Sequence, residues 1–137
     1  MINDGMTIGA AARKSGCPAA TIRYYEEIGL LRPVARGVNG RRIYGWPEVS
    51  RLRLIRRLRS LDFGIDRVRQ LIDAIEAETP ACLDVRDLAL AQLDVVRARR
   101  AELEALERTL IALASTCTEA CAGGATPDCS IVRDIAA

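Results

Sequence analysis

The segment TIGAAARKSGCPAATIRYYEEIGLL, residues 7–31, decides the fold. Thr7 is a suitable N-cap for a short helix, and Gly16 ends that helix because glycine readily adopts the left-handed conformation of a tight turn. Pro18 suits the first turn of a second helix, which runs to Gly29. Two short helices joined by a glycine-containing turn predict a helix-turn-helix.

A wing and two more helices are predicted after this segment. Residues 32–49 are rich in Gly and Arg, and after the turn at Asn39-Gly40 the sequence RRIY alternates as a short strand does. We therefore expect a two-stranded wing. Apolar residues at helical spacing then predict one helix that opens at Pro47 and a second that begins after Gly64.

The chain continues with a long helix. From Leu83 to about Ala114 it contains neither Gly nor Pro, which predicts one helix roughly 48 Å long. Its last apolar residues follow a nearly seven-residue repeat: Leu103, Leu106, Leu110 and Leu113. So small a domain cannot cover this stripe, so we expect the helix to pair antiparallel with its copy in a two-fold homodimer.

Charge divides the chain into two unlike halves. Residues 1–72 carry 14 Lys and Arg against 6 Asp and Glu, a net charge of +8. Residues 73–137 carry 6 against 12, a net charge of −6. The first half therefore suits a polyanionic partner, and the second does not.

Five cysteines and no histidine restrict the chemistry of the chain. Any metal site must use thiolates, carboxylates or backbone oxygens, and the commonest general base is missing. Because there is also no C-x-x-C pair, we expect no enzyme. The sequence has neither an apolar run of ~18 residues nor a leader pattern, which predicts a cytoplasmic protein with no membrane partner.

Together these segments resemble the MerR family of bacterial transcription regulators. The matching text is residues 7–31, then GRRIYGWPEVSRLRLIRRLRSLDFGIDRVRQLI at residues 40–72, then the long helix. The resemblance implies an all-α fold with a small β wing, in which a winged helix-turn-helix precedes a long antiparallel coiled-coil dimerisation helix. It implies three parts: a DNA-binding domain with linking helices at 1–75, a dimerisation helix at 76–116, and a metal-binding loop with a short helix at 117–137.

The resemblance also implies which residues contact promoter DNA. These are Thr21, Arg23, Tyr24 and Tyr25 from the second helix, and Arg41, Arg42 and Tyr44 from the wing. Arginine binds phosphates and guanine edges, and a tyrosine hydroxyl can fix a phosphate. From the residues alone, the alternative is that Ile22 and one tyrosine face the core and the arginines are only solvated. Dimers of the family bend and untwist the promoter when an effector binds, which allows RNA polymerase to use both promoter elements.

The cysteines indicate the effector. Metal-sensing members of the family place one cysteine at the start of the dimerisation helix and two more in the tail. This chain has Cys82 at that start, and Cys117, Cys121 and Cys129 in its tail. The resemblance implies that the ligands would be Cys82 and Cys129 with either Cys117 or Cys121, or all four, and that Cys82 would come from the other subunit. We expect Cys17 to be an ordinary buried residue.

Thiolates select soft metal ions over hard ones. Three thiolates suit Hg, Pb or Cd, and Zn is also a thiolate metal. Copper-type sensors resemble a two-thiolate site with Ser where this chain has Cys82, so Cu(I) held by two tail thiolates is the alternative. The sequence therefore predicts a regulator that activates metal-resistance or efflux genes.

Two further functions stay open. An iron-sulfur redox sensor of the same family would also use a cysteine-rich tail, although the C-x2-C-x-C run of that branch is absent here. A DNA-compacting protein without an effector would explain the basic half of the chain, but not Cys82 and the tail cysteines.

Overall fold

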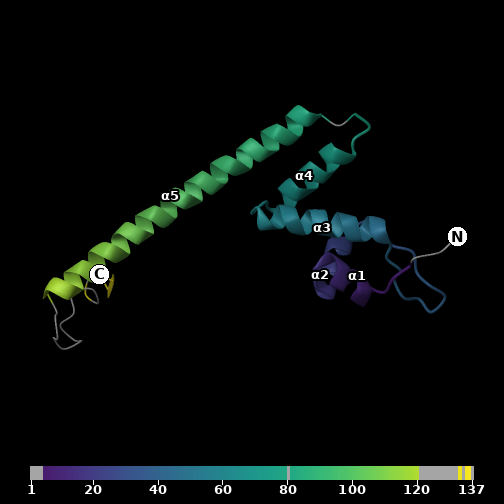
Figure 1. The fold of residues 1–137 in the computed structure, drawn as a ribbon, viewed down its shortest axis with the longest axis horizontal. Coiled ribbons are helices and arrows are strands. Elements are labelled where there is room, and N and C mark those ends of the chain that lie inside the picture. Colours follow the sequence, from purple (N-terminus) through teal and green to yellow (C-terminus); the bar gives the residue numbers. More distant parts are fainter. Residues whose placement is uncertain (1–4, 80, 121–132, 134, 137) are drawn as a thin grey trace. The chain divides into compact units, whose positions relative to one another are not determined.

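The structure is a computed structural model that describes residues 5–79, 81–120, 133, 135 and 136 of the chain. It divides into two compact units, Met1–Gln92 and Leu93–Ala137. The helices in chain order are α1 (Ile8–Ser15), α2 (Ala19–Glu27), α3 (Trp46–Ser60), α4 (Ile65–Glu76) and α5 (Cys82–Ala120), as Figure 1 shows. The predicted mostly helical fold with a helix-turn-helix and a long last helix is confirmed.

The turn between α1 and α2 has the predicted caps. The Thr7 side chain accepts a hydrogen bond from the Ala10 N–H at 3.2 Å, which satisfies one of the unpaired donors at the start of α1. Gly16 has a φ of 77°, and its N–H donates to the Ala12 carbonyl at 2.9 Å. Glycine is needed at this φ because a residue with a Cβ atom would have a strained backbone there.

One apolar core holds α1 to α4 together. Its largest fully buried side chains come from α2, the segment after α2, the end of the wing, α3 and α4: Ile22, Leu30, Leu31, Tyr44, Val49, Leu52, Ile55, Val68 and Ile72. Each aliphatic side chain of this size contributes about 2 kcal/mol when it is fully removed from water. Helix α1 packs against both α2 and α3, and it is α2 that carries four of the predicted DNA-binding residues.

The wing is a loop with bridges rather than a pair of strands. Two isolated antiparallel bridges join Met6 to Tyr44 and Arg36 to Arg42. The Gly37 N–H donates to the Arg41 carbonyl at 2.7 Å, and Gly40, with a φ of 77°, turns the chain between them. The turn was predicted at the right place, but the paired segments are too short to form the two strands that the sequence indicated.

The first turns of α5 belong to the first unit. Val85 and Leu88 pack against the core, and the Gln92 side-chain amide donates to the Leu61 and Asp62 carbonyls at 3.3 and 2.7 Å. Those two carbonyls lie in the turn after α3. The helix that was predicted from Leu83 thus begins in contact with the DNA-binding half of the chain.

In the second unit, α5 is a single helix with much exposed apolar surface. Its exposed apolar residues include Val96, Leu103, Leu106, Leu110 and Ile111. The helix extends to Ala120, beyond the predicted end near Ala114, because no Gly or Pro follows before Gly123. Cys117 therefore lies on the helix and not in a tail loop.

Candidate nucleic-acid interface and cysteine positions

The outer face of α2 carries three of the predicted DNA-binding residues. Arg23 and Tyr24 are exposed, Tyr24 by 47%, and Thr21 is half-buried one turn earlier. Ile22 lies on the opposite face and is fully buried. The helix therefore presents a guanidinium, a phenol and a hydroxyl to solvent, groups that contact phosphates and base edges in nucleic-acid complexes.

The structure places two further residues that were predicted to contact DNA, Tyr25 and Tyr44, in the core. Tyr25 is 7% exposed and Tyr44 is not exposed at all. Tyr25 is buried because it follows Ile22 by three residues on α2, which places both on the inner face of the helix. Tyr44 is buried because the wing returns to the core at this residue and pairs with Met6.

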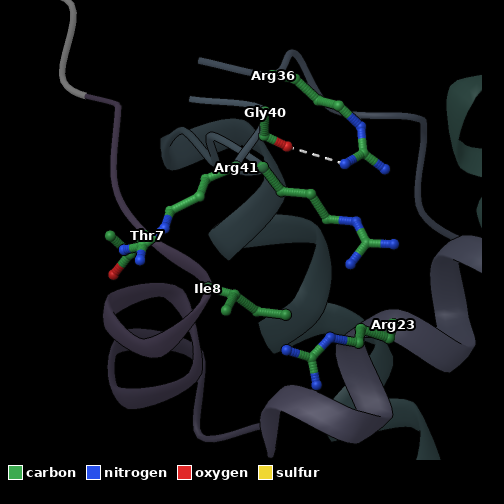
Figure 2. A pocket seen from close by; sticks show the side chains of 7 residues that line it. Thr7, Ile8, Arg23, Arg36, Gly40 and Arg41 are labelled. Carbon is green, nitrogen blue, oxygen red and sulfur yellow. Dashed lines mark hydrogen bonds between the residues drawn. The ribbon is translucent and has the colours of Figure 1, made fainter. Parts of the chain in front are cut away.

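Four arginines surround a hollow of about 370 Å³ between α2, the start of α1 and the wing. It is lined by Thr7, Ile8, Arg23, Arg36, Gly40, Arg41 and Arg42. Figure 2 shows the guanidinium groups of Arg36, Arg41 and Arg23 following one another from the wing down to α2. Arg36 is held there because its Nη1 donates to the Gly40 carbonyl at 2.9 Å. The sequence prediction named Arg23, Arg41 and Arg42 but missed Arg36.

An acidic side chain connects α2 with the wing beside this hollow. One carboxylate oxygen of Glu26 accepts a hydrogen bond from the Tyr44 hydroxyl, and the other lies 3.0 Å from Arg42 Nε. Burial, followed by the hydrogen bond to Glu26 and the charge of Glu26, raises the pKa of the Tyr44 hydroxyl. Tyr44 therefore stays protonated and remains a donor to Glu26 over the ordinary pH range.

A second basic groove of about 300 Å³ lies between the end of α1 and α3. Its lining residues are Ser15, Arg53, Arg56, Arg57 and Ser60. Arg53 donates to the Lys14 carbonyl through Nε and Nη2, at 3.0 and 2.8 Å. None of the three arginines forms a salt bridge in the part of the chain that the structure describes.

An exposed tryptophan lies beside this groove. The Lys14 ammonium is 4.9 Å and the Arg53 guanidinium carbon 5.9 Å from the centroid of the Trp46 ring, so both cations lie at cation–π distance. The sequence prediction missed the groove, although its signal was present: positions 53, 56, 57 and 60 follow the i, i+3, i+4, i+7 spacing of one helix face.

The cysteines fall into three positions. Cys17 is 4% exposed and its thiol contacts the Leu52 carbonyl at 3.7 Å, which confirms the prediction of an ordinary buried residue. Cys82 is exposed at the first residue of α5, and Cys117 is half-buried near the other end of that helix. Cys121 and Cys129 lie outside the described residues. Within the described residues, no group of three or more Cys, Asp or Glu side chains is placed to hold a metal ion.

No helix in the described ranges has the length and apolar character that would allow it to cross a membrane.

Two family models match the chain. The model described as "MerR HTH family regulatory protein" covers residues 6–75, and the model described as "MerR, DNA binding" covers residues 49–113. The first therefore includes α1 to α3, the wing and nearly all of α4, and the second includes α4 and most of α3 and α5.

Individual proteins are similar over nearly the full length. The HTH-type transcriptional regulator HmrR of Rhizobium leguminosarum bv. viciae is 43% identical, with 95% of this chain and 97% of the relative covered. Heavy metal-dependent transcription regulator 2 of Rhizobium meliloti (strain 1021) is 36% identical, with 96% and 86% covered. The crystal structure of PbrR691 from Ralstonia metallidurans CH34 in complex with lead(II) superposes with a TM-score of 0.81, at 34% identity and with 95% and 98% covered.

Proposed function

This chain belongs to the MerR family of helix-turn-helix transcription regulators, and from that membership we propose that it is a metal-responsive regulator that binds promoter DNA as a homodimer. It is not an enzyme, since its relatives are DNA-binding regulators. Its site of action would be the bacterial cytoplasm, where promoters and RNA polymerase are found.

The DNA-binding face that we propose combines α2 with the wing. Thr21, Arg23 and Tyr24 would act from α2, and Arg36, Arg41 and Arg42 from the wing. The groove with Arg53, Arg56 and Arg57 would add phosphate contacts. Tyr25 and Tyr44 would support this face from inside and would not contact DNA. What supports the proposal is that arginine guanidinium groups gather on two faces of the first unit.

The exposed stripe on α5 supports the homodimer. Leu103, Leu106 and Leu110 are about 60% exposed and follow a coiled-coil spacing. A single chain that exposes such a stripe to water gains stability when a second copy covers it. We propose that the two copies of α5 pair antiparallel, as the two-fold symmetry of most homodimers allows.

The position of Cys82 carries the metal proposal. It is exposed at the first residue of α5, while Cys117 lies 35 residues later on the same helix. Because an α-helix rises about 1.5 Å per residue, roughly 50 Å of helix separates these two residues. One chain therefore cannot bring both thiolates to one ion. A site that uses both would take Cys82 from one subunit and Cys117 from the other.

The donor set fits a soft ion. Thiolates favour Hg, Pb, Cd, Zn or Cu(I), and the proposed ligands are Cys82, Cys117, Cys121 and Cys129. When bound, such an ion would link thiolates of two subunits. The relative named as heavy metal-dependent and the lead(II) complex of PbrR691 support this class of effector. Cys82 favours a divalent ion over Cu(I), since it adds a third thiolate.

The dimer would act by changing the shape of the promoter DNA. A dimer that carries two first units can contact two half-sites of a bent or untwisted duplex. The energy for such a deformation, on the order of several kcal/mol, would come from the arginine contacts to phosphate. RNA polymerase is the partner that would use the deformed promoter to transcribe resistance or efflux genes.

The test is a metal titration of the reduced protein. Thiolate-to-metal charge-transfer absorbance is followed with Hg, Pb, Cd, Zn and Cu(I) in turn. Tight binding is expected for at least one divalent ion, and Cys82→Ser should weaken it more than ~10-fold because a ligand is lost. Cys17→Ala is the matched control and should bind as the wild type does, since Cys17 is buried in the DNA-binding unit.

Three outcomes would contradict parts of this proposal. No tight binding by any ion would remove the metal effector and leave a DNA-binding regulator. Undiminished Cu(I) binding by Cys82→Ser, without divalent binding in the wild type, would indicate a two-thiolate copper sensor. A brown iron-sulfur spectrum after anaerobic purification would indicate a redox sensor instead.

A further inference from the structure

Glu26 is an acidic residue beside a hollow that is lined by four arginines. Its side chain is 12% exposed, and it lies on α2 beside the hollow formed by Arg23, Arg36, Arg41 and Arg42. A carboxylate near a phosphate-binding face opposes the attraction to DNA. Its presence there therefore needs a compensating role.

The contacts of Glu26 indicate that role. One oxygen accepts from the Tyr44 hydroxyl and the other pairs with Arg42 Nε at 3.0 Å. Both partners belong to the wing, whereas Glu26 belongs to α2. Tyr44 is in turn tied to the segment before α1, because its N–H and carbonyl both pair with Met6, at 2.9 and 2.8 Å. Glu26 therefore connects the two elements that are expected to contact DNA.

The pairing uses only part of Arg42. A guanidinium has five N–H donors, and the ion pair with Glu26, in which Nε lies 3.0 Å from the carboxylate, leaves donors of Arg42 for other partners. Arg42 also lines the hollow. The attraction between the two opposite charges holds the Arg42 side chain close to α2, which restricts the directions in which its donors can point.

We propose that Glu26 is a positioning residue that determines DNA specificity: it fixes the Arg42 side chain and the wing relative to α2, and it lowers the attraction to DNA in general. This inference rests on the proposed DNA-binding function. A flexible wing with three unrestrained arginines would bind any duplex, because phosphate contacts carry no sequence information. A wing fixed by Glu26 offers one geometry, which suits some duplex shapes better than others.

The test compares Glu26→Gln with Glu27→Gln. Each variant removes one negative charge from α2, but Glu27 is exposed and has neither of the wing contacts of Glu26. The probes are the duplex that the wild type enriches from a random 30-base-pair pool, and a scrambled duplex of the same composition. Glu26→Gln should bind the scrambled duplex at least as tightly as the wild type, while its preference for the selected duplex falls about 10-fold. Glu27→Gln should bind both duplexes more tightly by the same factor and keep the wild-type preference for the selected duplex.

A second readout does not depend on DNA. In the free protein, hydrogen exchange at the wing amides of Gly37 and Ile43, which donate at 2.7 and 2.8 Å, should become at least ~10-fold faster in Glu26→Gln and stay unchanged in Glu27→Gln. The amides of the buried half of α3 serve as the control for folding, and they should exchange at the wild-type rate in both variants.

The outcomes separate this inference from the proposed function. If the wild type enriches a duplex, but Glu26→Gln keeps the preference or the slow exchange of the wing amides, this inference is overturned and the DNA-binding function stands. If the wild type enriches no duplex, the proposed promoter binding fails, and with it the specificity role of Glu26.

Discussion

At the scale of single residues, the Tyr44 hydroxyl is expected to make the first unit less stable as the pH becomes alkaline. Burial first, and then the hydrogen bond and the charge of Glu26, raise the pKa of Tyr44 above the value of about 10 that it has in the unfolded chain. The folded state therefore holds this proton more tightly. Its contribution to stability is complete below about pH 10 and is lost as the pH rises from there through the folded-state pKa.

Replacing Tyr44 tests this coupling. Tyr44→Phe keeps the buried ring and removes the titrating hydroxyl. Above about pH 10 the unfolding free energy of the variant should therefore fall less steeply than that of the wild type, and the two slopes should differ by up to ~1.4 kcal/mol per pH unit. Near pH 7 the variant should be about 1 kcal/mol less stable, because Glu26 loses a donor. Urea unfolding at a series of pH values measures both effects. Tyr24→Phe, which removes an exposed hydroxyl, should keep the wild-type slope, and an equal slope in Tyr44→Phe would refute the coupling.

The burial and contacts of some of these residues could be predicted from the sequence, and those of others could not. It left open that one of the two adjacent tyrosines faces the core, and the three-residue interval from Ile22 selects Tyr25. The burial of Tyr44 could not be predicted in the same way, because it depends on pairing with Met6, 38 residues away in sequence. Glu26 was missed for a similar reason: its partners are on the wing, and no local pattern reveals them.

At the scale of elements, the turn between α1 and α2 depends on Gly16. Its φ of 77° strains any other residue, and an added Cβ would also lie 2.5 Å from Arg56 Nη1. Gly16→Ala should lower the unfolding free energy by about 1–2 kcal/mol for the strain, and by more if Arg56 cannot move away. Gly40 has the same φ, but a Cβ added there would meet no atom within 4 Å. Gly40→Ala should therefore lower the unfolding free energy only by the cost of the backbone strain.

Chemical denaturation of the three alanine variants ranks these effects. Gly64→Ala is the control, because Gly64 has an ordinary φ of −67° and open space around its Cβ position. It should stay within about 0.5 kcal/mol of the wild type. If Gly16→Ala unfolded at the same urea concentration as Gly64→Ala, the proposed dependence of the turn on Gly16 would be wrong.

Helices were predicted more accurately than the wing for a physical reason. Caps and breakers act within a few residues, so Thr7 and Gly16 correctly predicted the bounds of α1. The end of α5 was predicted too early, since Thr116 and Thr118 are tolerated in the helix with their hydroxyls donating to carbonyls four residues earlier. Pairing in the wing depends on contacts across a loop and with Met6, which its alternating residues alone could not reveal.

At the scale of the whole molecule, the basic first half and the exposed α5 stripe have a joint consequence for DNA binding. Each first unit offers one set of arginine contacts, and two units on one duplex multiply their affinities only if they are joined. The apolar stripe of α5 is the surface that would join them. Loss of the dimer should therefore weaken DNA binding even though no residue of the DNA-binding face has changed.

Leu110→Glu tests this dependence. Leu110 is 65% exposed in the single chain, and a carboxylate there would be buried against the partner's stripe, which costs several kcal/mol without a counter-charge. The variant should sediment as a monomer at micromolar concentration, keep its helical content, and bind the selected duplex at least ~100-fold more weakly. Ala101→Glu adds the same charge to α5 on the face opposite Leu103 and Leu110, so it should remain dimeric. If Leu110→Glu stayed dimeric and bound DNA as the wild type does, the two copies would have to join through another surface.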